Sequence, residues 1–309
     1  MAQLRELKGR IKAVGNIKRI TKTMQMIATA KFQAAARRAT ATKPYTRKVA
    51  ELVGELVAAA SGQTSGDDAS VGGGFDHPLL RAPDKKTGRE LLLVITSNRG
   101  LCGAYNANVI RAITAHLREH PDVAPVLHVI GKKGLAYFRF TGKPVEKAHT
   151  HLGDKSTYTE IEALADEFMQ RFIAGEFDAV RVVSMRFISN ARQSPRVLTL
   201  LPIKPPEVPP PEVSAASRKP QAANVLYEFS PEPRELLAQL LPIAVKSQLF
   251  QAFNEAIVSE QIGRMVAMKA ATDNADQMGR NLKRSFNRAR QAMITTELTE
   301  IVSGAAALE

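Results

Sequence analysis

The sequence predicts an α/β fold in which long N- and C-terminal helices pair in a coiled coil that carries an inserted open-sheet, Rossmann-like domain. Apolar residues recur at heptad spacing at both ends of the chain, and buried strands alternate with helices in its middle. The predicted ranges are 1–60 for the N-terminal coiled-coil helix, 61–89 for a flexible Gly/Ser-rich excursion, 90–203 for the α/β globular domain, 204–229 for a Pro-rich linker and 230–309 for the C-terminal coiled-coil helix.

The N-terminal helix is predicted from apolar residues that follow one another at steps of three or four. Three equal steps from Ile11 to Ile20 predict a locally overwound patch. Pro44 is expected to kink this helix without ending it, because apolar spacing resumes at Val49. The predicted seam residues of this helix are Leu4, Leu7, Ile11, Val14, Ile20, Met24 and Ile27.

The C-terminal helix is predicted to be very long, because no proline follows Pro242. Its seam mixes small residues with large apolar ones, so a partner helix can approach closely while little area is buried per turn. This pattern is typical of a slender shaft. The predicted seam residues are Met265, Met268, Ala275, Leu282, Phe286, Ala289 and Met293.

The middle of the chain alternates between apolar, β-branched runs and amphipathic helical patterns. This order is typical of a three-layer open α/β sheet. The predicted strands are 90–96, 126–131, 179–188 and 196–203, and the predicted helices are 106–118, 132–140 and 158–173.

The net charge of +13 is concentrated at the N-terminus, where residues 1–50 hold thirteen Lys and Arg and a single acid, Glu6. A basic helix attracts phosphate, anionic lipid or an acidic protein surface, and charge alone does not choose among these partners. The candidate basic contacts are Lys8, Arg10, Lys12, Lys18, Arg19 and Lys22.

Composition bounds the class of protein. A chain of 309 residues with 44% hydrophobic content can bury one or two cores, and a single cysteine, Cys102, suits a reducing compartment. The longest apolar run, 91–95, is far shorter than the roughly 20 residues that a bilayer requires, and the N-terminus lacks the apolar core of a secretory signal. No membrane-spanning segment is therefore expected.

Two glycine-containing turns follow predicted strands, at 98–103 and 130–134, where open sheets often bind a nucleotide phosphate. Neither turn carries the full dinucleotide or phosphate-loop fingerprint. Both are therefore interpreted as structural turns.

The histidines and the cysteine also favour structural roles. His116 and His120 match an inverted zinc-protease motif, but Pro121 follows directly, which favours a solvated helix end. His149 and His151 are interpreted as exposed loop residues, and Cys102 as a small buried residue at a strand end. We expect no catalytic residue, no cofactor and no metal site.

Several stretches together resemble the gamma subunit of the F-type ATP synthase, the central rotor shaft of that complex. The segments similar to that family lie at 4–11, 20–26, 96–103, 106–108, 187–189, 200–203, 259–261, 265–275, 286–292, 294–301 and 304–308. The resemblance covers about 1–60, 90–203 and 225–309, and the Gly/Ser-rich and Pro-rich segments depart from the usual pattern.

The resemblance implies that the two long helices form a long antiparallel coiled coil, which turns inside an alpha3-beta3 hexamer. The α/β domain would lie against the epsilon subunit and the c-ring, with one copy per complex. The chain would couple c-ring rotation to conformational change at the beta-subunit catalytic sites of a proton-translocating enzyme. It would be a peripheral membrane protein on the cytoplasmic face of the bacterial inner membrane, in preference to an organelle membrane, and would bind no nucleic acid. The resemblance does not choose between H⁺ and Na⁺.

Two other classes stay open from the residues alone. A basic coiled-coil protein could bind nucleic acid, although the first helix has few aromatics for stacking on bases. An open-sheet enzyme is the second class, and it lacks the expected phosphate-binding and acid/base residues. Salt-sensitive DNA binding would favour the first class, and turnover by the isolated chain the second.

Overall fold

The computed structural model describes residues 2–62, 77–80, 87–203 and 232–306. The chain divides into two compact units, and each long helix contributes to both of them. Unit 1 comprises Met1–Lys31, Leu101–Gly103 and Gln261–Glu309, and unit 2 comprises Phe32–Gly100 and Ala104–Glu260.

The two terminal segments form the long helices α1 (Ala2–Gly62) and α5 (Pro233–Ala306). Pro44 lies inside α1 and Pro242 inside α5, and both helices continue through them. The Pro44 ring removes one backbone donor, so side-chain packing must hold the helix together there. Val49, Val53 and Leu56, which follow at helical spacing, are all buried.

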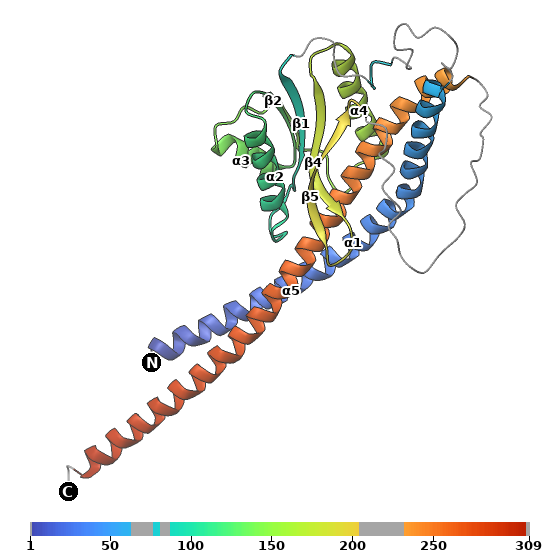
Figure 1. Ribbon diagram of the computed structural model, residues 1–309. Helices are drawn as coiled ribbons and strands as arrows, with labels where there is room; N and C mark the ends of the chain where they lie inside the picture. The colour runs from blue at the N-terminus through green and yellow to red at the C-terminus, as the bar shows by residue number, and fades with distance from the viewer. Residues whose placement is uncertain (1, 63–76, 81–86, 204–231, 307–309) are drawn as a thin grey trace. The chain divides into compact units, whose positions relative to one another are not determined.

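In unit 1 the two helices lie side by side and run in opposite directions (Figure 1). A Cβ on Gly279 would lie 3.8 Å from Val14 Cγ1, which places these residues opposite each other. Further along α1, Thr21 hydrogen-bonds to Thr272 at 2.8 Å. Residue numbers rise on α1 as they fall on α5, so the predicted antiparallel coil is confirmed.

The structure corrects part of the predicted α1 seam. Steps of four and three from Val14 lead to Lys18, Thr21, Gln25 and Ala28, and Ala28 is only 1% exposed. Lys18 forms an ion pair with Asp276, across the coil. The predicted seam residues Ile20 and Ile27 are instead 57 and 53% exposed, and Ile17, which lies on the same apolar spacing, is 51% exposed.

This regular alternation removes the predicted overwound patch. The error has a physical reason: α1 carries two apolar stripes, and only the partner helix decides which stripe is buried. Asp276 and Thr272 on α5 offer polar partners, so a lysine and a threonine occupy the contact where isoleucines were expected.

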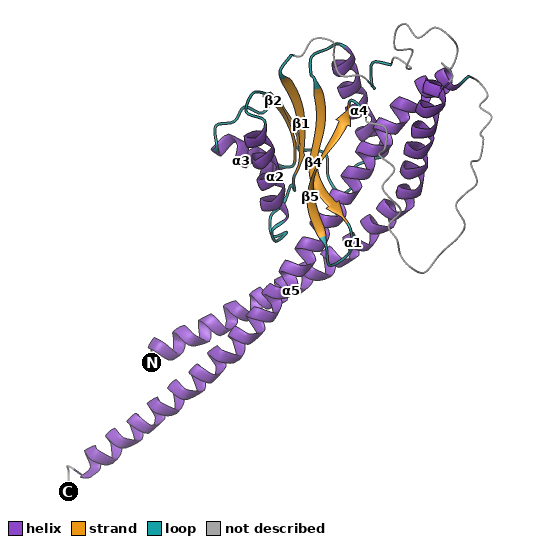
Figure 2. Ribbon diagram, in the orientation of Figure 1, coloured by secondary structure: helices purple, strands orange, loops and turns teal. Residues whose placement is uncertain are grey.

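Unit 2 is built on a five-stranded sheet with the order β3-β2-β1-β4-β5 (Figure 2). Strands β1, β2, β3 and β4 run parallel and β5 is antiparallel to β4. The strands are β1 (Arg89–Ile95), β2 (Ala124–Ile130), β3 (Lys147–His149), β4 (Ala179–Phe187) and β5 (Gln193–Leu201).

Three further helices cover this sheet. They are α2 (Tyr105–Glu119), α3 (Lys132–Phe140) and α4 (Tyr158–Ile173). Figure 1 shows α2 and α3 on one side of the sheet and α4 on the other. The predicted α/β class is thus confirmed. β1 reads as a continuous apolar run because both of its faces are covered, and Leu91 to Val94 are fully buried.

One stretch of α5, within Glu235–Gly304, is long and apolar enough by composition to cross a membrane, with a mean hydropathy of 1.2. The sequence prediction considered only uninterrupted apolar runs and did not find it. In the fold, 39% of this stretch is buried inside the protein, and core helices of soluble proteins meet the same criterion. The stretch is therefore weak evidence for a membrane span.

Candidate functional site

The first half of α1 presents an exposed basic face in unit 1. All six residues predicted as basic contacts are exposed there. Arg10 pairs with Glu6 at 2.5 Å, and Arg19 donates to the Asn16 side-chain oxygen at 3.2 Å. Because these partners are themselves exposed, the face keeps its positive charge toward solvent.

Exposed apolar side chains lie on the parts of α1 and α5 that belong to unit 1. Isolated exposed apolar residues are ordinary, but a series of them along helices marks a contact surface for another protein. They are Ile17, Ile20, Met26 and Ile27 on α1, and Val266, Met278, Ile294, Leu298, Ile301 and Val302 on α5.

The last turns of α5 extend beyond the start of α1. The pairs Val14 with Gly279 and Thr21 with Thr272 fix the register, which places Ala2 opposite about residue 291 of α5. Within the described part of the chain, α1 therefore offers nothing opposite residues 294–306. The exposed Ile294, Leu298 and Ile301 lie three or four residues apart there, so they share one face of a helix that α1 does not cover.

Thr96, which follows β1 and precedes the first glycine turn, hydrogen-bonds to the second turn, 130–134. The Thr96 hydroxyl donates to the Ile130 carbonyl at 2.8 Å and accepts from the Gly134 amide at 2.9 Å. A Cβ on Gly131 would lie 2.3 Å from the Thr96 carbonyl oxygen, and one on Gly134 would lie 2.7 Å from its hydroxyl. Only glycine fits at these two positions.

The β1–α2 loop also occupies the first amides of α3. The Lys133 amide donates to the Ser97 carbonyl at 3.1 Å, and the Lys132 amide to the Asn98 side-chain oxygen at 3.2 Å. In nucleotide-binding sheets such amides bind phosphate. Here they are engaged within the protein, which supports the interpretation of both turns as structural.

His116 occupies a buried polar cluster with Glu90 and Arg181. Its Nε2 lies 2.8 Å from a Glu90 carboxylate oxygen, and Arg181 pairs with the other oxygen of the same carboxylate. The predicted solvated position is therefore wrong for His116, which is 5% exposed, whereas His120 is exposed. Among the described residues no group of His, Cys, Asp and Glu could hold a metal ion.

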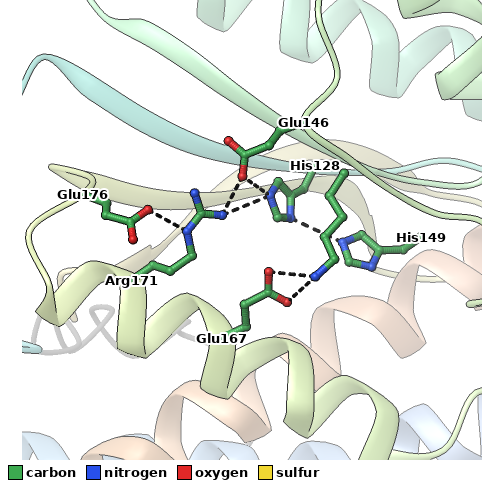
Figure 3. Close-up of polar contacts among 7 residues, drawn as sticks. His128, Glu146, His149, Glu167, Arg171 and Glu176 are labelled. Carbon is green, nitrogen blue, oxygen red and sulfur yellow. Dashed lines mark hydrogen bonds and ion pairs between the residues drawn. The ribbon is translucent and has the colours of Figure 1, made fainter.

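A second polar cluster joins β2, β3 and α4 (Figure 3). His149 Nε2 lies 3.3 Å from His128 Nδ1, and His128 Nε2 lies 3.2 Å from the Glu146 carboxylate. Arg171 pairs with Glu146 at 2.7 Å and with Glu176 at 2.8 Å.

The positions of the predicted histidines differ from one another. His149 is buried on β3, so its predicted loop position is wrong, whereas His151 is exposed. Little in the sequence indicates β3, because this strand has three residues and only one of them is buried. The sequence signal was weak: in the run Lys147–His149 only Ala148 is apolar.

Burial sets the charge of this second cluster. Desolvation lowers the pKa of His149 to about 4, with a further contribution from the neighbouring His128. Desolvation also lowers the pKa of His128, against the opposing influence of Glu146. The Glu146 carboxylate, 3.2 Å from His128 Nε2, is closer to this nitrogen than Arg171 Nη1 at 3.5 Å and favours a proton on it; in that tautomer Nδ1 accepts from Nε2–H of His149. Both imidazoles are therefore neutral near pH 7.

Cys102 is buried, as the sequence predicted, in a loop that packs on α5 within unit 1. A Cβ on the next residue, Gly103, would lie 3.4 Å from the Gly263 carbonyl oxygen. The close approach of this loop to α5 accounts for the small residues on both sides.

These features define a protein whose exposed surfaces are built for contact with other chains: a paired-helix shaft with basic and apolar faces, joined in sequence to an α/β domain with internally occupied turns. The family model described as ATP synthase matches residues 3–308. Together with the full-length curated relatives below, which are ATP synthase gamma chains, this match shows that the chain belongs to the ATP synthase gamma-chain family.

Curated relatives agree over the full length. The ATP synthase gamma chain of Exiguobacterium sibiricum is 40% identical, with 99% of each chain covered. The gamma chain of Leptospira biflexa is 38% identical, and both chains are covered completely. A chain of the Euglena gracilis mitochondrial ATP synthase has a similar fold, with a TM-score of 0.63 and 18% identity over 99% of this chain and 95% of that one.

Proposed function

We propose that this chain is the central-stalk rotor subunit of a proton-translocating F-type ATP synthase. Its partners are the alpha3-beta3 hexamer, the epsilon subunit and the c-ring, with one copy per complex. The observation that carries this proposal is the antiparallel pairing of α1 with α5, fixed by the Thr21–Thr272 contact, in a chain of the gamma family.

The coil and the α/β domain have different roles in this proposal. The coil transmits torque, and its asymmetric surface favours a different conformation in each beta subunit, as differential contact with several states requires. The α/β domain takes up rotation from the c-ring. In this proposal the chain supplies no catalytic residue. We therefore expect no detectable ATP hydrolysis by the isolated chain.

We further propose that the exposed basic face of α1 contacts acidic segments of the ring. Long-range attraction between opposite charges guides assembly and is screened by salt. The exposed apolar face at 294–301 would occupy the bore of the ring, where it loses its contact with water. The complex would sit peripherally on the cytoplasmic face of a bacterial inner membrane.

The coil seam is tested by the double substitution Leu282→Asp with Phe286→Asp. Both side chains are half-buried in the α1–α5 pair, so two carboxylates there should loosen the coil. In the reconstituted complex, ATP hydrolysis should continue while ATP-driven proton pumping into vesicles is lost.

A matched control adds the same two charges on the exposed side of the same turns, with Ser285→Asp and Asn287→Asp. Pumping should survive in this control. Full coupling in the L282D/F286D complex would overturn the role of the seam, and equal loss in both variants would show an effect of charge alone.

A further inference from the structure

Helix α3 and the turn after it carry a concentrated positive charge. Residues 132–145 contain four cations and no acid. All four cations are exposed: Lys132, Lys133, Arg139 and Lys143. Phe140 lies among them and is 90% exposed, the highest value among the large apolar side chains of the described residues. These five residues are called the α3 face below.

The fold explains why this face points outward. Gly134 and Phe138 form the buried side of α3, and the helix contacts β2 and α2. Figure 1 shows α3 at the outer flank of the sheet in unit 2. The same anchoring leaves Arg139 and Phe140, one and two residues further on, in solvent.

An aromatic ring surrounded by lysine and arginine matches the chemistry of an anionic membrane surface. Each Lys or Arg near anionic headgroups contributes about 1 kcal/mol of attraction, and aromatic side chains partition into the interface. We propose that the α3 face binds the headgroups of anionic phospholipids, with Phe140 entering the interfacial layer. The proposal rests on the proposed function for one point, the location of the complex at a membrane.

Two other occupants fit less well. A single bound phosphate needs converging donors, but the first amides of α3 are already bonded to Thr96, Ser97 and Asn98. A protein interface generally excludes lysine from its core, whereas three of the four cations here are lysines. The four cations are spread around one ring that is 90% exposed, and this arrangement fits an extended anionic surface better than a single phosphate or a protein interface.

The experiment uses the absence of tryptophan from the sequence. Phe140→Trp in the full chain introduces one fluorescent reporter on the α3 face. With vesicles of phosphatidylglycerol and phosphatidylcholine its emission should shift to shorter wavelength, and with phosphatidylcholine alone it should not. The matched reporter Ile188→Trp, at an exposed apolar residue of the β4–β5 turn, should show no shift.

The cations are tested in the F140W background. Arg139→Gln with Lys143→Gln should weaken vesicle binding about thirtyfold, the factor for about 1 kcal/mol per cation. Lys8→Gln with Lys12→Gln removes the same charge from α1 and should leave the emission shift of the F140W reporter unchanged. This control separates the α3 face from the general basicity of the chain.

Several results would overturn the proposal: no shift at F140W, an equal shift at I188W, equal weakening by both glutamine pairs, or a shift with polyglutamate but not with vesicles. The last result would indicate an acidic protein partner. None of them bears on coupling in the L282D/F286D complex, so the failure of this proposal is distinguishable from failure of the rotor assignment.

Discussion

Thr21 of α1 and Thr272 of α5 meet in the middle of the coil with their hydroxyl oxygens 2.8 Å apart. Thr272 Oγ1 is also 2.8 Å from the Met268 carbonyl oxygen. Thr21 Oγ1 likewise lies 3.1 Å from the Lys18 carbonyl oxygen, so each hydroxyl has a carbonyl of its own helix as an alternative acceptor, and one of the two donates its proton across the coil. The contact between the two helices is thus polar at this level, and it fixes their register more narrowly than apolar packing alone.

Thr272→Val should destabilise the coil by about 1 kcal/mol, because the shape is kept while the hydrogen bond between the two helices is lost. Hydrogen exchange of the α1 amides around Thr21 should accelerate accordingly. Thr23→Val is the control, since Thr23 is exposed and bonds only to the Arg19 carbonyl of its own helix. Equal protection in T272V and the unaltered chain would contradict a register role for the pair.

The threonine pair also shows where sequence reasoning fails. The heptad period and the two helices were visible in the sequence, because periodicity is a local property, whereas the antiparallel pairing was implied by the resemblance to the gamma subunit. Which apolar stripe of α1 is buried depends on α5, more than 200 residues away. Ile20 and Thr21 are adjacent, and only the position of Thr272 decides between them.

Gly131→Ala should destabilise the α/β domain by about 4 kcal/mol or more. Its φ is +95°, and a Cβ would lie 2.3 Å from the Thr96 carbonyl oxygen, where backbone cannot retreat. Gly142→Ala is the matched control: its φ is +67° with no atom within 4 Å, so it should cost only about 1 kcal/mol. Urea unfolding followed by circular dichroism compares the two, and similar midpoints would refute the steric argument.

Glu90→Gln should cost about 3 kcal/mol, because Glu90 is buried and the change breaks its pairs with the buried His116 and the half-buried Arg181. Glu176→Gln removes a half-buried partner of Arg171, which keeps Glu146 as its other partner, and should cost less than about 1 kcal/mol. Urea titration of both variants gives the comparison. A cost for E90Q no larger than that of E176Q would mean that the Glu90 pairs contribute little.

The two buried histidine clusters could not be predicted from the sequence, again because each depends on a partner that is distant along the chain. Apolar, β-branched runs identify β1 and β4, but a buried His116 or His128 is recognisable only once its partner is known. Glu90 and Glu146 lie 26 and 18 residues away from them. Packing of α2 against the sheet brings His116 to Glu90, and pairing of β2 with β3 brings His128 to Glu146. One sequence shows neither contact.

The histidine pair between β2 and β3 should make stability depend on pH in a defined window. The folded pKa of His149 is about 4, below its ordinary value of 6.5, so between these values the unfolded chain binds a proton that the folded chain does not. The contribution of neutral His149 to the free energy of unfolding is therefore complete above pH 6.5. It is lost as the pH falls toward 4, by up to about 1.4 kcal/mol per pH unit for one proton. His128, with its pKa also lowered, adds a change of the same sign.

Other charged groups face the same pair. Glu167 and Lys147, which pair at 2.8 Å, oppose each other in their effect on His149. Glu146 has its pKa lowered below 4.5 by Arg171, so its own contribution is lost only at still lower pH. The upper part of the window, from 6.5 to 4.5, thus reports on the histidines.

His149→Gln should flatten the pH dependence in this upper part, because the side chain no longer titrates. His151→Gln, at an exposed neighbour, should leave the slope unchanged. The free energy of unfolding is measured in urea across the window for both variants and the unaltered chain. A slope that persists in H149Q but disappears in H151Q would place the titrating group on the surface and refute the buried pair as its source.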